Sequence, residues 1–563
     1  MTLLMILTVA GPLAGTAAAA CGARARAAGW TASAGALVSL ACAVWLLAAE
    51  LHRAPLRGWG GYLYLDSLSC FFLLTVTAVT LLASVGSVAY LSAEQDSGRL
   101  SAFQVRLYYV FFGLFAALML AALETGNLGL LFVLIEASTL ASAALVGLEA
   151  RASSLEAAWK YVIISSFGVT IALAGTLFLY YSASGLHLAA SYRLAWPYLF
   201  SHAHALAPGS LRLAFLLAVV GYGTKVGLAP MHTWLPDAHA EAPSPASAML
   251  SAALLNTGMY AIIRFLAITH ARLGSTFPRA VLLTFGFLSI VIGVLFMIRR
   301  GNFKRLFAYS SVEHMGIIAV ALGFGGLLGL YGALLQTLNH AIAKAVLFLT
   351  SGDAALRYKT REAAGVSGLL AAAPVTGAAL LLGSFAVLGS PPFGVFLSEL
   401  TIIRAGFATS SPVFPLLLLA LLAVAFVAFA RTTTGMVTGR PSMAPPGERP
   451  DESKPGSHLT APGPLSSPGT PHGMAGRVSA EAAGTAGTAG TTVALEEVPG
   501  EEALREAPGE TLREGGPGPY RGRPAGLAAI VPLVVGLAAL LVLGLWIPAG
   551  LDTVIRHCVA VMS

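Results

Sequence analysis

Charged residues are scarce in this sequence. Only 10% of its 563 residues are Asp, Glu, Lys or Arg, whereas 56% are hydrophobic, and the mean hydropathy is +0.78. A soluble domain carries about 25% charged residues, so this composition excludes that class. Apolar runs of about 20 residues, enough to cross about 30 Å of hydrocarbon as a helix, recur along most of the chain. They are too long for strands, and we therefore predict an all-α polytopic membrane protein.

Cysteine is also rare, and its spacing is uninformative for metals. The four cysteines are Cys21, Cys42, Cys70 and Cys558. They form no CxxC pair and no iron–sulfur binding run, so we expect no cofactor in this chain. One loop holds His232, Asp237 and His239, which are metal-ligating residue types. Four prolines in and around this loop make it irregular, and we predict no metal site there.

The basic residues form no continuous stripe of the kind that binds nucleic acid, although the formal charge is +7. They lie in short loops between apolar runs, where positive charge sets the orientation of membrane helices. Most of them follow odd-numbered runs, including Arg99, Arg151, Arg305 and Arg361. These loops are therefore predicted to face the cytoplasm of a bacterial inner membrane, with both termini on the periplasmic side.

Apolar runs bounded by Gly, Pro or charge predict about fourteen spans. They are residues 2–20, 30–50, 63–91, 106–123, 127–148, 157–182, 211–229, 243–269, 279–298, 306–325, 327–350, 367–408, 412–436 and 525–547. The first has no basic region before it, so we interpret it as a retained helix and not as a signal peptide. The twelfth is too long for one crossing and contains Gly389-Ser390-Pro391-Pro392, which predicts a break within the membrane.

The spans suggest five segments. They are N-terminal helices at 1–105, a first repeat at 106–270, a second repeat at 271–437, a linker at 438–524, and a C-terminal helix with a tail at 525–563. Gly/Pro interruptions in the seventh and twelfth spans lie five spans apart, so the two five-helix repeats are expected to be inverted. The linker is rich in Pro, Gly, Ser, Thr and Ala, and we expect it to be disordered, cytoplasmic and dispensable.

Four ionisable side chains fall inside the predicted spans, where each costs about 2.5–3.5 kcal/mol to insert. They are Glu136, Lys225, Lys344 and Glu399. None has an opposite charge three or four residues away, so their partners must come from other helices. A buried ion pair that locks two helices, or a lysine that reaches the membrane interface, would also explain such a residue. A proton path is favoured because Glu313, His314 and His340 add more proton-carrying groups.

Two local patterns sharpen this hypothesis. Lys225 lies five residues before Pro230 in a glycine-rich helix, where the backbone can adjust. We therefore predict that Glu136 and Lys225 form a switchable pair in which Lys225 carries the proton. His340 and Lys344 are four residues apart and so share one helical face.

The segment GTKVGLAPMHTWLPDAHAEAPSPASAML resembles the signature of the antiporter-like proton-translocating subunits of complex I, the NADH-quinone oxidoreductase chains M, L and N. IEASTLASAALVGLE, EAAWKYVIISSFG, AYSSVEHMGI and PPFGVFLSE are most similar to the F component of hydrogenase-4-type complexes. The resemblance implies that the chain works beside other membrane subunits in the lipid bilayer. It also implies a peripheral redox module with iron–sulfur and nickel–iron centres.

The resemblance assigns roles to the four costly charges. Glu136 and Lys225 match the family's glutamate and lysine pair, Lys344 its central lysine, and Glu399 its terminal carboxylate. These four residues are the same ones that the free-energy cost of placing a charge in the membrane had already singled out.

One position departs from the family pattern. Complex I subunits usually carry a lysine where this chain has Asn256. Glu313, beside His314, is an acid that complex I itself does not usually have at this place. We therefore expect Glu313 and His314 to supply the step that the missing lysine performs.

Three functions remain open from the sequence. The first is a proton-pumping subunit driven by redox chemistry in partner subunits, which the hydrogenase-like segments favour. The second is a subunit of a multisubunit sodium/proton antiporter with the same fold. The third is a passive membrane anchor, which is disfavoured by the number of intramembrane charges.

Overall fold

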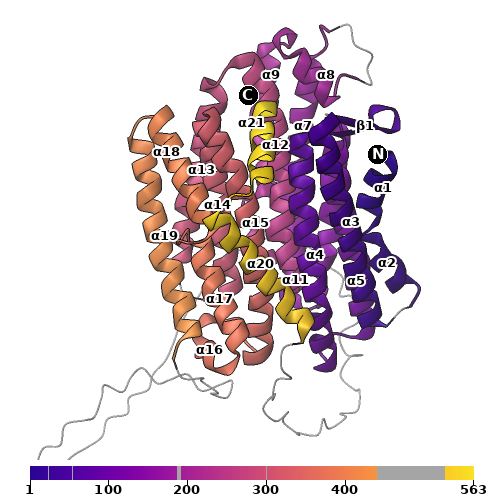
Figure 1. Ribbon diagram of the computed structural model, residues 1–563, viewed down its shortest axis with the longest axis vertical. Helices are drawn as coiled ribbons and strands as arrows, with labels where there is room; N and C mark the ends of the chain where they lie inside the picture. The colour runs from indigo at the N-terminus through magenta and orange to yellow at the C-terminus, as the bar shows by residue number, and fades with distance from the viewer. Residues whose placement is uncertain (23, 54, 187–191, 300, 440–525, 563) are drawn as a thin grey trace, which may run out of the picture. The chain divides into compact units, whose positions relative to one another are not determined.

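The computed structural model describes the chain except residues 23, 54, 187–191, 300, 440–525 and 563. Helices make up almost all of the described chain (Figure 1), which confirms the predicted all-α membrane class. Twelve of the described helices are long and apolar enough to cross a membrane, or thirteen if the bent pair α1 and α2 is one span. The predicted linker at 438–524 lies outside the described residues except for its first two.

The N-terminal helices are α1 (Thr2–Ala10), α2 (Leu13–Ala20), α3 (Ala25–Arg53), α4 (Ser67–Asp96), α5 (Ala102–Glu124), α6 (Leu128–Val146) and α7 (Ala152–Ser182). The first predicted span is bent by 49° between α1 and α2. An antiparallel hairpin of β1 (Leu56–Gly58) and β2 (Leu63–Leu65), joined by the 3-10 turn Trp59–Gly61, precedes α4. The sequence did not predict this small sheet.

The middle of the chain contains α8 (Trp196–Ser201), the 3-10 turn Ala203–Ala205, α9 (Pro208–Val226), α10 (Trp234–Glu241), α11 (Ser244–Met249) and α12 (Leu255–Leu273). A π-helical turn at Leu250–Leu254 joins α11 to α12. The loop that we predicted to be irregular contains the short helix α10. Pro236 is the third residue of that helix, where the missing N–H would have had no intrahelical partner.

The second half contains α13 (Thr276–Met297), α14 (Phe303–Phe324), α15 (Gly326–Tyr358), the 3-10 turn Ala363–Gly365, α16 (Leu369–Ala372), α17 (Pro374–Val387), α18 (Gly394–Thr409), α19 (Val413–Val437), α20 (Leu527–Leu545) and α21 (Ala549–Met562). The gap between α17 and α18 confirms the predicted break in the twelfth span. In the predicted C-terminal tail, the segment after α20 forms the helix α21.

The most buried helices are those that carry polar residues. The span formed by α11 and α12 is 100% buried over its apolar window, and α14 and α15 are each 94% buried. By contrast, the corresponding windows of α19 and α20 are 22% and 28% buried. The costly charges on α14 and α15 therefore lie in the interior of the helix bundle and not on its lipid-facing surface.

The loops that follow odd-numbered spans meet at one end of the bundle, which we call the basic end. It comprises residues 97–101, 147–151, 298–299, 301–302 and 359–368. Arg361 pairs with Glu149, and a β-bridge joins Asn302 to Glu362. Figure 1 shows both chain ends at the opposite end from α16, which lies at the basic end.

A buried ion pair joins α4 to α12 on the side of the chain ends. Two guanidinium nitrogens of Arg264 donate to the two carboxylate oxygens of Asp66, each at 2.6 Å. Asp66 also caps α4 by accepting from the Ser69 backbone N–H at 2.9 Å. The Arg264 guanidinium lies 4.5 Å from the ring centroid of Trp196 on α8. This pair therefore fixes three helices at once.

We predict that Asp66→Asn lowers the thermal unfolding midpoint of the assembled complex. Removing one partner leaves the other charge buried and unpaired, which costs about 3–5 kcal/mol. The exposed pair of Arg26 and Asp96 provides a control, and Asp96→Asn should change the midpoint little. Equal midpoints for the two variants would contradict this assignment.

Candidate functional site

Lys225 lies fully buried near the end of α9 and is held by Tyr161 of α7. Its ammonium donates to the Tyr161 hydroxyl at 3.1 Å and lies 4.8 Å from the centroid of the same ring. The hydroxyls of Tyr161 and Ser142 of α6 are 2.7 Å apart. The direct partners of the cation among the described contacts are thus a neutral hydroxyl and a ring face.

Glu136 of α6 lies near this group but makes no ion pair with Lys225 among the described contacts. Its carboxylate accepts from Ser166 at 2.7 Å and from Thr139 at 3.3 Å. The two residues are close enough to interact electrostatically. The predicted pair is therefore not in direct contact in this structure, because Tyr161 occupies the position beside the ammonium.

The break after α9 is fixed by hydrogen bonds from neighbouring segments. Gly227 ends the helix in the left-handed region, with φ +80°. The Trp234 indole donates to the Thr224 carbonyl at 2.7 Å, and the Ala229 N–H donates to the Ser289 hydroxyl of α13 at 2.9 Å. The freed backbone groups next to Lys225 are therefore satisfied inside the protein, as a nonpolar membrane requires.

Lys344 and Glu313 form the centre of a second cluster, on α15 and α14. The Lys344 ammonium donates to the Phe307 carbonyl at 2.9 Å. Lys344 and Glu313 are both buried and interact electrostatically. Gly293 of α13 allows close approach here, since an added Cβ would lie 3.0 Å from the Glu313 Cβ.

Two histidines extend this cluster. The rings of His314 and His340 have centroids 5.3 Å apart. His314 Nδ1 lies 2.8 Å from the Gln336 amide nitrogen, and Gln336 accepts from the Ser398 hydroxyl of α18. Neither ring nitrogen of the buried His340 has a hydrogen-bond partner among the described residues. This line of groups can hold or pass a proton between α14, α15 and α18.

Glu399 lies at the far end of the line, beside the break between α17 and α18. It is 8% exposed and contacts Gln336. Gly389 of the break has φ +62°, and a Cβ added to it would lie 2.0 Å from Glu399 Oε2. Gly394 also packs closely against Asn339 of α15, with an added Cβ 2.4 Å from its Oδ1. The glycines therefore let the broken backbone form the wall of the carboxylate site.

Asn256 of α12 lies between the two clusters. Its amide nitrogen donates to the Ala252 carbonyl at 2.8 Å and to the Thr337 carbonyl of α15 at 3.4 Å. Its Oδ1 is buried and has no partner among the described residues. Two residues further along α12, Gly258 packs against Lys225, with an added Cβ 3.4 Å from the lysine Cβ.

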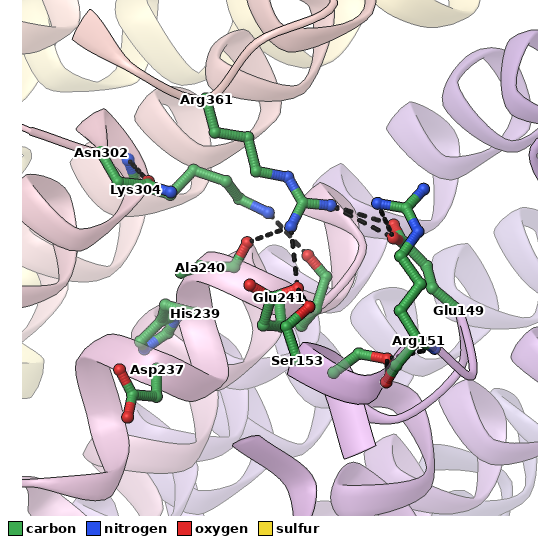
Figure 2. Close-up of polar contacts among 12 residues, drawn as sticks. Glu149, Arg151, Ser153, Asp237, His239, Ala240, Glu241, Asn302, Lys304 and Arg361 are labelled. Carbon is green, nitrogen blue, oxygen red and sulfur yellow. Dashed lines mark hydrogen bonds and ion pairs between the residues drawn. The ribbon is translucent and has the colours of Figure 1, made fainter. Parts of the chain in front are cut away.

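A charged network lies at the basic end, and Figure 2 shows its polar contacts around Arg361. Arg361 donates to Glu149 and to Glu241, each at 3.1 Å, and to the Ala240 carbonyl at 2.9 Å. Burial lowers the pKa of Arg361, but the nearby carboxylates of Glu149 and Glu241 outweigh this effect. The pKa of Arg361 is therefore raised overall, and the guanidinium stays charged. Lys304 donates to the Ala242 carbonyl at 2.6 Å in the same network.

His239 of α10 lies between this network and the second cluster. Its ring stacks on Phe348 with centroids 4.8 Å apart, and it interacts electrostatically with Lys304 and Lys344. Asp237 points elsewhere, because it pairs with Arg305 at 2.6 Å. The residues that we considered as metal-ligand types thus serve different neighbours.

Several residues of the site were not selected from the sequence. They are Tyr161, Ser142, Lys304, Gln336 and Ser398. Gln336 was detectable, because Gln336, His340 and Lys344 are spaced four residues apart and share one face of α15. Lys304 was assigned to a loop, whereas it is the second residue of α14 and is buried. Tyr161 carries no charge, so it is not found by looking for side chains that are expensive to bury in a membrane.

Comparison with known proteins places this arrangement in a family. Residues 125–425, just over half of the chain, match the family described as "NADH:quinone oxidoreductase/Mrp antiporter, TM". The hydrogenase-4 component F homolog of Methylacidiphilum infernorum is 40% identical over 354 residues, which cover 62% of this chain and 74% of that protein.

Two solved structures have the same fold. A chain of the Mrp complex from Dietzia sp. DQ12-45-1b has a TM-score of 0.74 at 23% identity, covering 100% of this chain and 97% of that one. A chain of the membrane-bound sulfane sulfur reductase, an archaeal respiratory membrane complex, has a TM-score of 0.69 at 24% identity, covering 79% and 90%. On the family match and the 40% identical relative, the chain belongs to the NADH:quinone oxidoreductase/Mrp antiporter transmembrane family.

Proposed function

We propose that this chain carries protons across a bacterial cytoplasmic membrane as one subunit of a complex I-like or hydrogenase-4-type complex. The observation that carries the proposal is the line of polar groups from the half-buried Glu136 and the buried Lys225, through Asn256, to the buried Lys344 and Glu399. Burying so many ionisable groups is expensive, and a passive anchor would not need them. The 40% identity to a hydrogenase-4 component F homolog supports this function.

The redox chemistry belongs to partner subunits in this proposal. The chain supplies only side chains that accept, hold and release protons, and it carries no cofactor of its own. Other membrane subunits and a peripheral module with iron–sulfur and nickel–iron centres would supply the driving reaction. Domain boundaries at 105, 270 and 437, and the inverted repeats of the two halves, are part of the same proposal.

The two breaks give Lys225 and Glu399 room to change partners. Lys225 lies in the last turn of α9, two residues before Gly227, and Glu399 lies beside the second break. A shift of the backbone at either break would change which group faces the charge. In this mechanism Lys225 alternates between the Tyr161 hydroxyl and a closer approach to Glu136, and the proton leaves when the carboxylate is distant.

We predict that Lys225→Ala and Glu136→Gln each reduce proton translocation by at least about tenfold, equivalent to about 1.4 kcal/mol of barrier. Assembly and electron transfer in the partner subunits should persist. The measurement is proton uptake by the complex in sealed vesicles. Glu156→Gln and Lys160→Gln, which alter an exposed pair on α7, serve as matched controls. Translocation at the unmodified rate in both site variants would make the pair a scaffold.

A second prediction concerns the departure at Asn256. If Glu313 and His314 replace the missing lysine, Glu313→Gln should impair translocation by about tenfold while the amount of assembled complex stays constant. Vesicle assays and quantification of the purified complex measure the two effects separately. Normal translocation in Glu313→Gln would leave Glu313 as a contact between α13 and α14.

The alternative is a subunit of a multisubunit sodium/proton antiporter, a function that the fold of the Mrp complex also accommodates. The two functions differ in the transported ion and in the driving reaction. Uptake of labelled sodium driven by a pH gradient, without electron transfer, would favour the antiporter. The genes beside this one would separate the two as well, because each complex needs different partners.

We also propose that the basic end faces the cytoplasm, since Lys and Arg are retained on that side. Both chain ends then lie in the periplasm. We predict that a periplasm-active reporter fused after Ser563 is active, whereas one active only in the cytoplasm is silent. Fusions within the loop at 147–151 should give the reverse result. Cytoplasmic activity of the fusion after Ser563 would overturn this orientation.

A further inference from the structure

The helix α20 contains only apolar residues and glycine, yet it contacts the helices that carry the second cluster. It packs against α4, α15, α17 and α18, and Figure 1 shows it running diagonally across them. Lys344 lies on α15 and Glu399 on α18. This helix can therefore carry no proton itself, but it touches the elements that hold two of the proposed carriers.

The contact with the second break is a backbone contact. A Cβ added to Gly544 would lie 1.9 Å from the Pro392 carbonyl oxygen and 2.5 Å from the Phe393 carbonyl carbon. Real Cβ atoms do not approach backbone atoms this closely, and a backbone cannot rotate away as a side chain can. Any residue larger than glycine at position 544 must therefore displace α20 or the break.

The same break contacts the carboxylate site on its other side. Gly389 packs directly on the Glu399 carboxylate, with an added Cβ 2.0 Å from Oε2. Gly394 packs on Asn339, the neighbour of His340. A displacement at Pro392 is thus transmitted over two or three residues to the wall around Glu399.

The rest of α20 is anchored, so the helix cannot simply tilt away. Gly536 packs against Val346 of α15, with an added Cβ 2.4 Å from a Val346 methyl carbon. The side chain of Leu540 is fully buried. After α20, Asp552 of α21 accepts from the Tyr331 hydroxyl of α15 at 2.8 Å.

We propose that α20 is a positioning helix for the second broken span. Gly544 sets the backbone at Pro392 and Phe393, and through Gly389 it sets the place of the Glu399 carboxylate. The first break has its own support from Ser289 of α13, so the two breaks are held by different means. The proposal rests on the proton-carrying function argued above, with Gly544 acting through other residues and not on the proton.

The test compares Gly544→Ala and Gly544→Val with Gly550→Ala in the complete complex. An added Cβ at Gly550 meets nothing within 4 Å, so this variant is a matched control. We expect Gly544→Ala to assemble and transfer electrons but to lose about tenfold or more of its proton translocation, because a misplacement of about 1 Å can cost about 100-fold. Gly544→Val should lose more, and Gly550→Ala should match the unmodified complex.

A spectroscopic readout separates positioning from general damage. In pH-difference infrared spectra, the carboxyl band of Glu399 is identified by its loss in Glu399→Gln. We expect this band to shift in Gly544→Ala and to stay in place in Gly550→Ala. An unshifted band together with full translocation in Gly544→Ala overturns the proposal.

Two further outcomes are decided by the same design. If Gly544→Ala fails to assemble, Leu540→Ala is used instead, because it loosens the packing of α20 without adding atoms. An unshifted Glu399 band together with full translocation in Leu540→Ala rejects the proposal. If the unmodified complex translocates no protons, the proposed function fails. The band shift in Gly544→Ala then still reports whether α20 positions Glu399.

Discussion

A lysine ammonium inside a membrane has no water to solvate it, so the protein must supply its hydrogen-bond partners. Lys225 is held by the hydroxyl and ring of Tyr161, and Lys344 by the backbone carbonyl of Phe307. Both partners are neutral. A carboxylate in direct contact would stabilise the cation more deeply and would hold its proton. In the proposed mechanism, neutral partners make burial tolerable and let the proton leave while carboxylates such as Glu136 or Glu313 stay out of direct contact.

Burial cost alone predicted the four principal charges and their place on separate helices, and the Gly/Pro sequence predicted the second break. What it could not predict was the partner of each charge, because that depends on which helices become neighbours. Tyr161 belongs to a different span from Lys225. It is uncharged, so its burial in the membrane carries no large free-energy cost that would mark it in the sequence. For the same reason, the expected contact of Glu136 with Lys225 is not found among the described contacts. The fourteen predicted spans also exceed the twelve or thirteen found among the described residues.

The Asn256 position shows how the two clusters are joined without a central lysine on α12. Its amide bridges to the Thr337 carbonyl of α15, which places it against the helix that carries Lys344. An amide cannot hold a proton as a lysine does, but it can donate and accept at the same place. In the proposed relay, the charge that α12 lacks comes from Glu313 and Lys344, which interact across α14 and α15.

Glycine sets the geometry of this site more than ion pairs do. Helices in a membrane associate through close backbone packing at small residues, since lipid gives no hydrophobic driving force between them. Gly293 brings α13 onto Glu313, and Gly389 brings the broken backbone onto Glu399. Gly544 places a whole helix against that same backbone. At Gly293 and Gly544 the contacts include main-chain atoms of the neighbouring segment, so a small shift of a helix there has no flexible side chain to absorb it. In the proposed function, such packing passes a displacement of α20 to the buried charge beside the second break.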